Sequence, residues 1–150
     1  MTEAKAISRH VAMGKQDKKQ IGRKTDGLIR SIEWFNWLSG SVHAVAIRQV
    51  WRPGSFIDVP EHHENIVASG KKNLADAFSK IEARLAKTEW AVGDGYTVVD
   101  PYLLVFYRWG NRIGFDMRDQ YQSWTKHSLQ VLARPATLRT LTREAISIWS

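Results

Sequence analysis

The chain has 150 residues, which is enough for one domain with a buried hydrophobic core. It contains no cysteine, which excludes a disulfide framework, and its apolar runs are too short to predict a membrane span or a secretory signal. The formal net charge is +7, and we expect a cytoplasmic protein.

The positive charge is concentrated near the N-terminus. Residues 1–30 hold eight Lys and Arg against three Asp and Glu, whereas the rest of the chain holds 14 against 12. We therefore expect residues 1–25 to form a basic, flexible tail and residues 26–150 to form the domain. The tail offers cations for phosphate groups but no aromatic side chain that stacks on a base, so nucleic acid is not an expected partner.

A long amphipathic helix is predicted over residues 26–51, because apolar residues recur there mostly at intervals of three and four. Asp26 can cap its first turn, and the helix is expected to end near Trp51 because helical geometry is disfavoured just before Pro53. Its predicted buried face consists of Leu28, Ile32, Phe35, Leu38, Val42, Val45 and Val50.

A second amphipathic helix is predicted over residues 61–86, after a loop marked by Pro53, Gly54 and Pro60. Its predicted apolar face consists of Ile66, Leu74, Phe78, Ile81 and Leu85. Its outward cations are predicted to be Lys71, Lys72, Lys80 and Arg84.

The third predicted helix begins with a start signal at Thr97. Its hydroxyl can accept a hydrogen bond from the backbone N–H three residues on, and Asp100 can reach back to the N–H of Thr97, an acidic form of the capping box. Residues 102–109 are apolar nearly all round, so we expect this helix to be buried at the centre of the domain. It is expected to end between Gly110 and Gly114.

Two further helices are predicted over residues 119–133 and 135–146, the second with Pro135 at its first position. No stretch alternates with a period of two for long enough to predict a sheet. The sequence therefore predicts an all-α fold of five helices, with the helix that starts at Thr97 at the centre.

The segment Gly93–Trp109 carries the pattern Gly-x-x-Tyr-Thr-x-x-Asp-x-Tyr-Leu-x-x-x-x-Arg-Trp. This pattern resembles the core helix of the C-terminal, all-helical domain of glutathione S-transferases, in particular the bacterial beta-class-like branch. Residues 33–43 resemble the first helix of that domain, and residues 124–144, with an Arg134–Pro135 hinge, resemble its last two helices. The resemblance covers residues 28–146 and implies the five-helix bundle of this domain type.

The resemblance also implies a function, the conjugation of glutathione to apolar electrophiles in detoxification. It implies a homodimer or a thioredoxin-like partner domain. The positions that it implicates in binding glutathione or the apolar substrate are Asn36, Gly40, Ser41, Val42, His43, Tyr102, Phe106, Arg108 and Trp109. A plain structural role is the alternative: His43 can be a helix-packing residue with a hydrogen-bonded imidazole, and aromatic residues on a buried helix can be ordinary core.

The remaining histidines have simple explanations. The cluster Glu61-His62-His63-Glu64 lacks the ligand spacing of a zinc site, so no metal is expected and the cluster is interpreted as the polar start of a helix. His10 and His127 are expected to be unpaired surface residues.

The sequence supports only a limited expectation of glutathione conjugation. In the family that the chain resembles, the thiol-activating residue and most glutathione contacts lie on an N-terminal thioredoxin-like domain with a βαβ unit. The residues before the first predicted helix here show no strand pattern. We therefore expect weak or no conjugation by this chain alone, no catalytic residue, and no cofactor apart from glutathione as a co-substrate. The alternative is a non-catalytic helical module for protein interaction or ligand binding.

Overall fold

The computed structural model describes residues 25–149, and every regular element in that range is helical. The predicted all-α fold class is therefore confirmed. The expectations for the tail and for His10 lie outside the described residues. The elements that follow the long first helix are α4 (His63–Leu85), α5 (Val99–Ile113), α6 (Met117–Gln120), α7 (Gln122–Leu132) and α8 (Pro135–Arg143).

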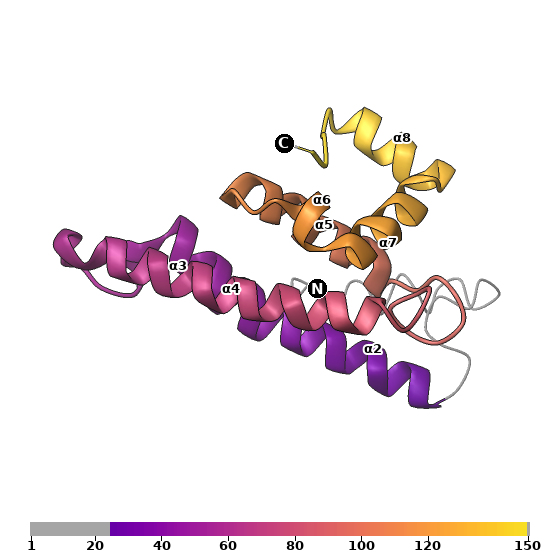
Figure 1. Cartoon of the computed structure of the whole chain (residues 1–150), viewed down its shortest axis with the longest axis horizontal. Coiled ribbons are helices and arrows are strands. Elements are labelled where there is room, and N and C mark those ends of the chain that lie inside the picture. Colours follow the sequence, from indigo (N-terminus) through magenta and orange to yellow (C-terminus); the bar gives the residue numbers. More distant parts are fainter. Residues whose placement is uncertain (1–24, 150) are drawn as a thin grey trace.

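The long first helix packs along α4, and the later helices lie above this pair in the view of Figure 1. It consists of α2 (Thr25–Trp37), a π-helical segment η2 (Leu38–Ile47) and α3 (Arg48–Trp51). It ends at Trp51, as predicted, because Arg52 leaves helical geometry immediately before a proline.

The π-helical segment was not predicted, and one local side-chain hydrogen bond lies at its start. The Ser39 hydroxyl donates a hydrogen bond of 2.6 Å to the carbonyl of Phe35, the group that the Ser39 N–H would use in an α-helix. A π-helical turn contains more residues than an α-helical turn. The buried positions along η2 therefore recur every four residues, and the last of them is followed directly by one more buried residue. They are Leu38, Val42, Ala46 and Ile47.

This change of pitch corrects the predicted buried face. Val45 was expected in the core but is 42% exposed, because the wider turn carries the neighbouring Ala46 inward instead. Ile32 is 41% exposed, because the buried side of α2 runs through Ser31, Trp34 and Phe35. The interval pattern identified the helix correctly but misplaced two members of its core face.

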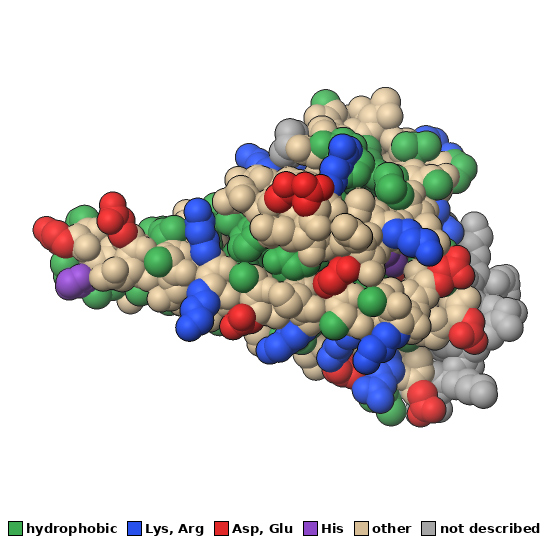
Figure 2. Space-filling model, viewed as in Figure 1, with side chains coloured by type: hydrophobic (Ala, Val, Ile, Leu, Met, Phe, Trp, Pro, Cys, Tyr) green, Lys and Arg blue, Asp and Glu red, His purple; other side chains and the backbone are tan. Residues whose placement is uncertain are grey.

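The helix α4 confirms the second predicted helix. It is preceded by two 3-10 turns, η3 (Pro53–Ser55) and η4 (Pro60–His62). Four of its five predicted apolar residues are buried, and Ile66 is half-buried. All four predicted outward cations are exposed, and Figure 2 shows basic side chains along the outer edge of this helix.

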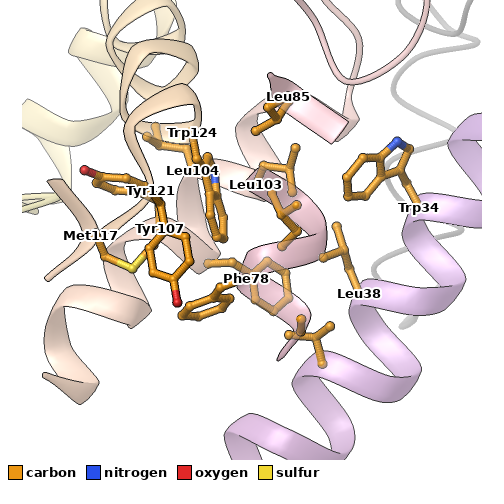
Figure 3. Close-up of a cluster of buried hydrophobic side chains, with 14 of the residues drawn as sticks. Trp34, Leu38, Phe78, Leu85, Leu103, Leu104, Tyr107, Met117, Tyr121 and Trp124 are labelled. Atoms are coloured by element: carbon orange, nitrogen blue, oxygen red, sulfur yellow. The ribbon is translucent and has the colours of Figure 1, made fainter. Parts of the chain in front are cut away.

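The helix α5 ends at Gly114 with φ 95°, a left-handed geometry that suits glycine and closes the helix where predicted. Its inner side packs against α4, α7 and the long helix, as Figure 3 shows for Leu103, Leu104 and Tyr107. The expectation of burial nearly all round is wrong on the outer side, where Val105 is 38% exposed. The helix is therefore central but one-sided.

The single helix predicted over residues 119–133 is instead two helices, α6 and α7. Tyr121 breaks them apart with φ −130° and ψ 67°, and its ring is buried against the core. Phe78 of α4 lies at the centre of this part of the core, with ring centroids 5.2 Å from Trp124 and 5.7 Å from Tyr121. The helix α8 begins at Pro135 as predicted but ends three residues early, at Arg143.

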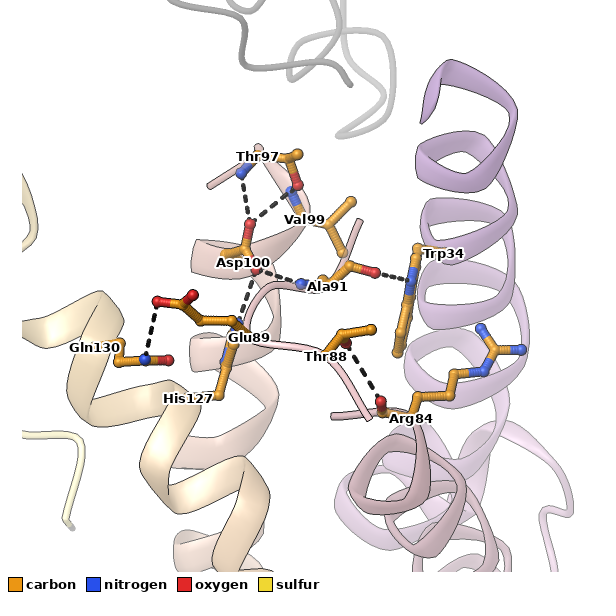
Figure 4. A network of polar contacts seen from close by, with 10 residues as sticks. All are labelled: Trp34, Arg84, Thr88, Glu89, Ala91, Thr97, Val99, Asp100, His127 and Gln130. Carbon is orange, nitrogen blue, oxygen red and sulfur yellow. Dashed lines mark hydrogen bonds and ion pairs between the residues drawn. The ribbon is translucent and has the colours of Figure 1, made fainter. Parts of the chain in front are cut away.

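The first turn of α5 is held by one buried carboxylate, that of Asp100 (Figure 4). Its Oδ2 accepts hydrogen bonds from the backbone N–H and the hydroxyl of Thr97, at 2.6 and 3.0 Å. The predicted contact from Asp100 back to Thr97 is thus present. The opposite contact differs, because the Thr97 hydroxyl accepts from the N–H of Val99 at 3.3 Å rather than from Asp100.

The second oxygen of Asp100 corrects the expectation for His127. Oδ1 accepts from the backbone N–H of Ala91 at 2.9 Å and lies 2.8 Å from Nε2 of His127. His127 was expected to be an unpaired surface residue, but its side chain is 2% exposed and paired. Sequence spacing gave no hint of this contact, because 27 residues separate the two partners along the chain.

Candidate functional site

The predicted site residues of α5 form a continuous row of aromatic rings. Tyr102, Phe106 and Trp109 follow one another at spacings of four and three, so they share one side of the helix. Ring centroids are 5.0 Å apart for the first pair and 5.2 Å apart for the second, both with edge-to-face geometry. We refer to these three residues together with His43 and Trp51 as the aromatic face.

The long helix supplies the other side of the aromatic face. His43, on the π-helical segment, lies with its ring centroid 5.1 Å from that of Trp109. Trp51, at the end of α3, meets the same indole edge-on at 5.3 Å. Trp109 is therefore enclosed between two side chains that are eight residues apart on the long helix.

Burial divides the predicted residues into a floor and a surface. Phe106 is fully buried and Val42 is 1% exposed, and we call these two side chains the floor. Tyr102 and Trp109 are half-buried, whereas His43 and Trp51 are exposed. A bound molecule would contact the last four and not the floor.

The polar chemistry of the aromatic face comes mainly from one phenol. Burial raises the pKa of Tyr102 above its ordinary value of 10.0, so the hydroxyl keeps its proton at neutral pH. No hydrogen bond joins this hydroxyl to another residue of the described part of the chain. It is therefore available as a donor to a polar group on an otherwise apolar ligand.

The other predicted positions lie around this face or away from it. Asn36, Gly40 and Ser41 are exposed on the long helix, and a Cβ added at Gly40 would meet no heavy atom within 4 Å. Arg108 binds the C-terminal segment, where its Nε donates a hydrogen bond of 2.8 Å to the carbonyl of Ser147. The structure thus brings His43 together with the α5 aromatics and gives Arg108 a different partner.

Sequence reasoning missed two aromatic neighbours of the site. Phe35 packs against Tyr102, with ring centroids 5.5 Å apart, and Trp51 packs against Trp109. A signal existed for Trp51, which follows His43 by two turns on a helix whose end had been located correctly. Phe35 had been assigned to the core, and it is indeed buried.

The described residues contain neither a metal cluster nor a membrane-spanning helix. No group of three His, Cys, Asp or Glu side chains among residues 25–149 is arranged to hold a metal ion. The ring of His63 instead lies 2.9 Å from the carbonyl of Ile57, close to where the polar helix start was predicted. No helix in the described part of the chain is long and apolar enough to cross a membrane.

Solved structures with the same fold include bacterial glutathione transferases. A glutathione transferase homolog from Sulfitobacter, with bound glutathione, superposes with a TM-score of 0.88 at 18% identity, covering 97% of this chain and 69% of that one. The enzyme from Xylella fastidiosa gives a TM-score of 0.87 at 16% identity over 98% and 71% of the two chains. A sphingomonad enzyme complexed with glutathione gives 0.82 at 21% identity over 98% and 69%.

At these identities the structural matches establish the fold. A search of curated protein sequences gave no significant match. The sequence itself matches the family described as "Glutathione S-transferase, C-terminal domain" over residues 42–135, which is more than half of the chain. The chain therefore belongs to the glutathione S-transferase C-terminal domain family.

Proposed function

We propose that this chain forms the apolar-substrate side of a glutathione S-transferase-like protein. The observation that carries the proposal is the aromatic face, where half-buried and exposed rings lie over a floor of fully buried side chains. Flat rings with one accessible phenol suit an aromatic, polarised electrophile better than a flexible polar ligand. Glutathione, which is bound in several of the similar structures, is the proposed co-substrate.

We propose further that the residues of this sequence conjugate glutathione weakly on their own. Conjugation to an aryl halide requires the glutathione thiolate to attack the ring carbon while the halide leaves and the thiol proton passes to solvent. A group that lowers the thiol pKa accelerates this step. We assign that role to no residue of the aromatic face, because in this family the thiol-activating residue lies on the N-terminal thioredoxin-like domain.

The binding part of the proposal is tested with 1-(S-glutathionyl)-2,4-dinitrobenzene, whose nitroaromatic ring quenches tryptophan fluorescence. Replacing Trp109 with alanine removes the ring at the centre of the face and should weaken the Kd about tenfold. Trp149→Ala is the matched control, since this tryptophan is 40% exposed and packs on Arg118 and Tyr107 instead. Equal affinities in the two variants would contradict the aromatic face as the binding site.

The activity part is tested with glutathione and 1-chloro-2,4-dinitrobenzene. We expect a kcat/KM at least about tenfold below that of a complete transferase measured alongside. A kcat/KM less than about tenfold below that of the complete transferase would contradict weak activity, but it would leave the proposed binding site intact. Supplying a separate thioredoxin-like domain should raise the rate if that domain provides the thiol activation.

A second candidate function is a protein-interaction module. It is favoured by exposed apolar side chains near the far end of the long helix and in the loop after it. These are Val45, Trp51, Phe56 and Val59, with exposures between 42% and 44%. Light scattering separates the candidates: a compact monomer across a concentration series argues against self-association through these side chains, and a homodimer supports it.

A further inference from the structure

A hollow lies away from the aromatic face, between the C-terminal end of α4 and one side of α7. Its volume is about 460 Å³, within the range of small-molecule sites. None of its lining residues belongs to the aromatic face. They are Leu85, Ala86, Lys87, Thr88, Glu89, Ser123, Lys126, His127 and Gln130.

The side of α7 that faces this hollow is polar along its whole length. Ser123, Lys126, His127 and Gln130 are spaced by three, one and three residues, so they lie on one side of the helix. The opposite wall is the segment 87–89, which carries a lysine, a threonine and a glutamate. Both walls therefore present hydrogen-bonding and charged groups to the same space.

His127 is the buried polar group in this lining. The Asp100 carboxylate accepts from the N–H of Ala91 and from two groups of Thr97, so it acts as the acceptor toward His127 as well. The proton of the His127 ring is therefore assigned to Nε2. In the neutral form of the ring this leaves Nδ1 as a lone-pair acceptor, and it has no hydrogen-bond partner within the described residues although it is buried.

The charges at the hollow have both signs. Lys87 and Lys126 are exposed, one on each wall, and they suit a carboxylate. Glu89 is also exposed and carries a weak contact of 3.4 Å from Gln130, which leaves acceptor capacity for an incoming cation (Figure 4). The backbone N–H groups at the start of α7 play no part here, because Glu82 accepts from them at 2.8 and 2.9 Å.

We propose that this hollow is a binding site for a small α-amino acid. Its carboxylate would be held by Lys87 and Lys126, and its ammonium group would donate to the Glu89 carboxylate and, once the side chains that cover it move aside, to Nδ1 of His127. An amino acid carries both groups on one carbon, which matches two basic side chains and two acceptors around one space. The proposal is independent of the transferase function, because the two sites share no residue.

The first experiment follows the nitrogen signals of His127 in ¹⁵N-labelled full-length protein during titration with L-alanine, L-glutamine and L-phenylalanine. We expect saturable binding of at least one amino acid with a Kd of about 1 mM or tighter, together with a shift of the Nδ1 signal as it gains a donor. Propionate and ethylamine, which each carry half of the recognised chemistry, should bind at least about tenfold more weakly. An unmoved Nδ1 signal at about 20 mM of all three amino acids would overturn the proposal.

The second experiment compares two lysines without touching the buried pair. Lys126→Met removes one cation from the hollow and should weaken amino acid binding about tenfold. Lys80→Met is the matched control, because this exposed lysine of α4 is not part of the lining. Equal weakening in both variants would show that the protein's overall charge, and not this site, attracts the ligand. Both positions are exposed, so both variants are expected to fold.

Discussion

The Asp100 network and the aromatic face are built on the same helix, α5, but they use it differently. At the first turn, a carboxylate that is 0% exposed accepts four hydrogen bonds and ties α5 to the preceding loop and to α7. Further along, the rings of Tyr102 and Trp109 meet aromatic side chains of the long helix and keep accessible surface. Saturated polar contacts hold the fold in place, whereas incompletely covered apolar contacts leave rings accessible at the surface.

Asp100→Ala should have the largest effect, because it removes the acceptor from a buried site. The N–H groups of Ala91 and Thr97 and the ring of His127 would lose their partner. We expect the free energy of unfolding to fall by about 4 kcal/mol, measured by urea denaturation. Affinity for the nitroaromatic probe should stay unchanged while the variant is folded.

The control for this variant is Asp94→Ala, since Asp94 is an exposed acid in the same loop region. Its effect on unfolding should stay within about 0.5 kcal/mol. If Asp100→Ala lowers the free energy of unfolding by less than about 1 kcal/mol, the Asp100 network does not contribute substantially to stability. A change in ligand affinity at unchanged stability would show that the two regions are not separate.

Gly70→Ala tests the seam between α4 and the long helix that carries His43. A Cβ at this position would lie 2.7 Å from Cβ of Gln49 and 3.1 Å from the carbonyl oxygen of Ala46, so backbone would have to move. We expect a loss of about 2 kcal/mol in the free energy of unfolding. Gly40→Ala is the matched comparison on the exposed side of the long helix.

The Gly40 variant should change stability in the opposite direction. A Cβ there meets nothing within 4 Å, and alanine is favoured over glycine inside a helix by up to about 1 kcal/mol. Urea denaturation of both variants gives the two signs directly. Destabilisation by Gly40→Ala would mean that the π-helical geometry itself depends on a residue without a side chain.

The alkaline limit of stability is expected to depend on tyrosines near both regions. Burial raises the pKa of Tyr102 on the aromatic face and of Tyr96 beside Arg134 above the ordinary value of 10.0. The unfolded chain then loses these protons at lower pH than the folded chain. The stabilisation is therefore fully present below about pH 10 and is lost as the pH rises through the folded-state values.

Phenolate absorbance and urea denaturation, followed together from neutral to alkaline pH, measure this dependence. Tyr102→Phe and Tyr96→Phe should each make the decline less steep. If Tyr102 titrates at or below the ordinary value, it is more exposed to water than the aromatic face described above requires.

The smallest effect is expected outside both regions, at the end of α8. Ala145 adopts φ 50°, a left-handed geometry that glycine adopts at lower cost, and the N–H of Ile146 closes the helix end on the carbonyl of Leu141 at 3.0 Å. Ala145→Gly should therefore raise the free energy of unfolding by about 0.5 kcal/mol, measured by urea denaturation. Probe affinity should not change, and a destabilised variant would contradict the geometry of this helix end.

The Asp100 network and the aromatic face differ in how much of each could be predicted from the sequence. The start of α5 was located from Thr97 and Asp100 alone, because capping partners lie three residues apart and local chemistry determines them. The partner of Asp100 on α7 was missed, because helix packing and not local sequence brings His127 to it. The same limit applies to the predicted ligand contacts, since periodicity placed Phe106 and Trp109 on one side of α5 but did not show which of them is covered.

Taken by itself, the sequence determined the helices, most of their ends, the all-α class and the family resemblance, because these depend on intervals of a few residues. Tertiary structure decided the rest: the π-helical pitch that turned Val45 outward, the break at Tyr121, the burial of His127 and the enclosure of Trp109 between two turns of the long helix. Each of these depends on the free energy of packing surfaces that lie far apart in the chain, and local propensity contains no information about that packing.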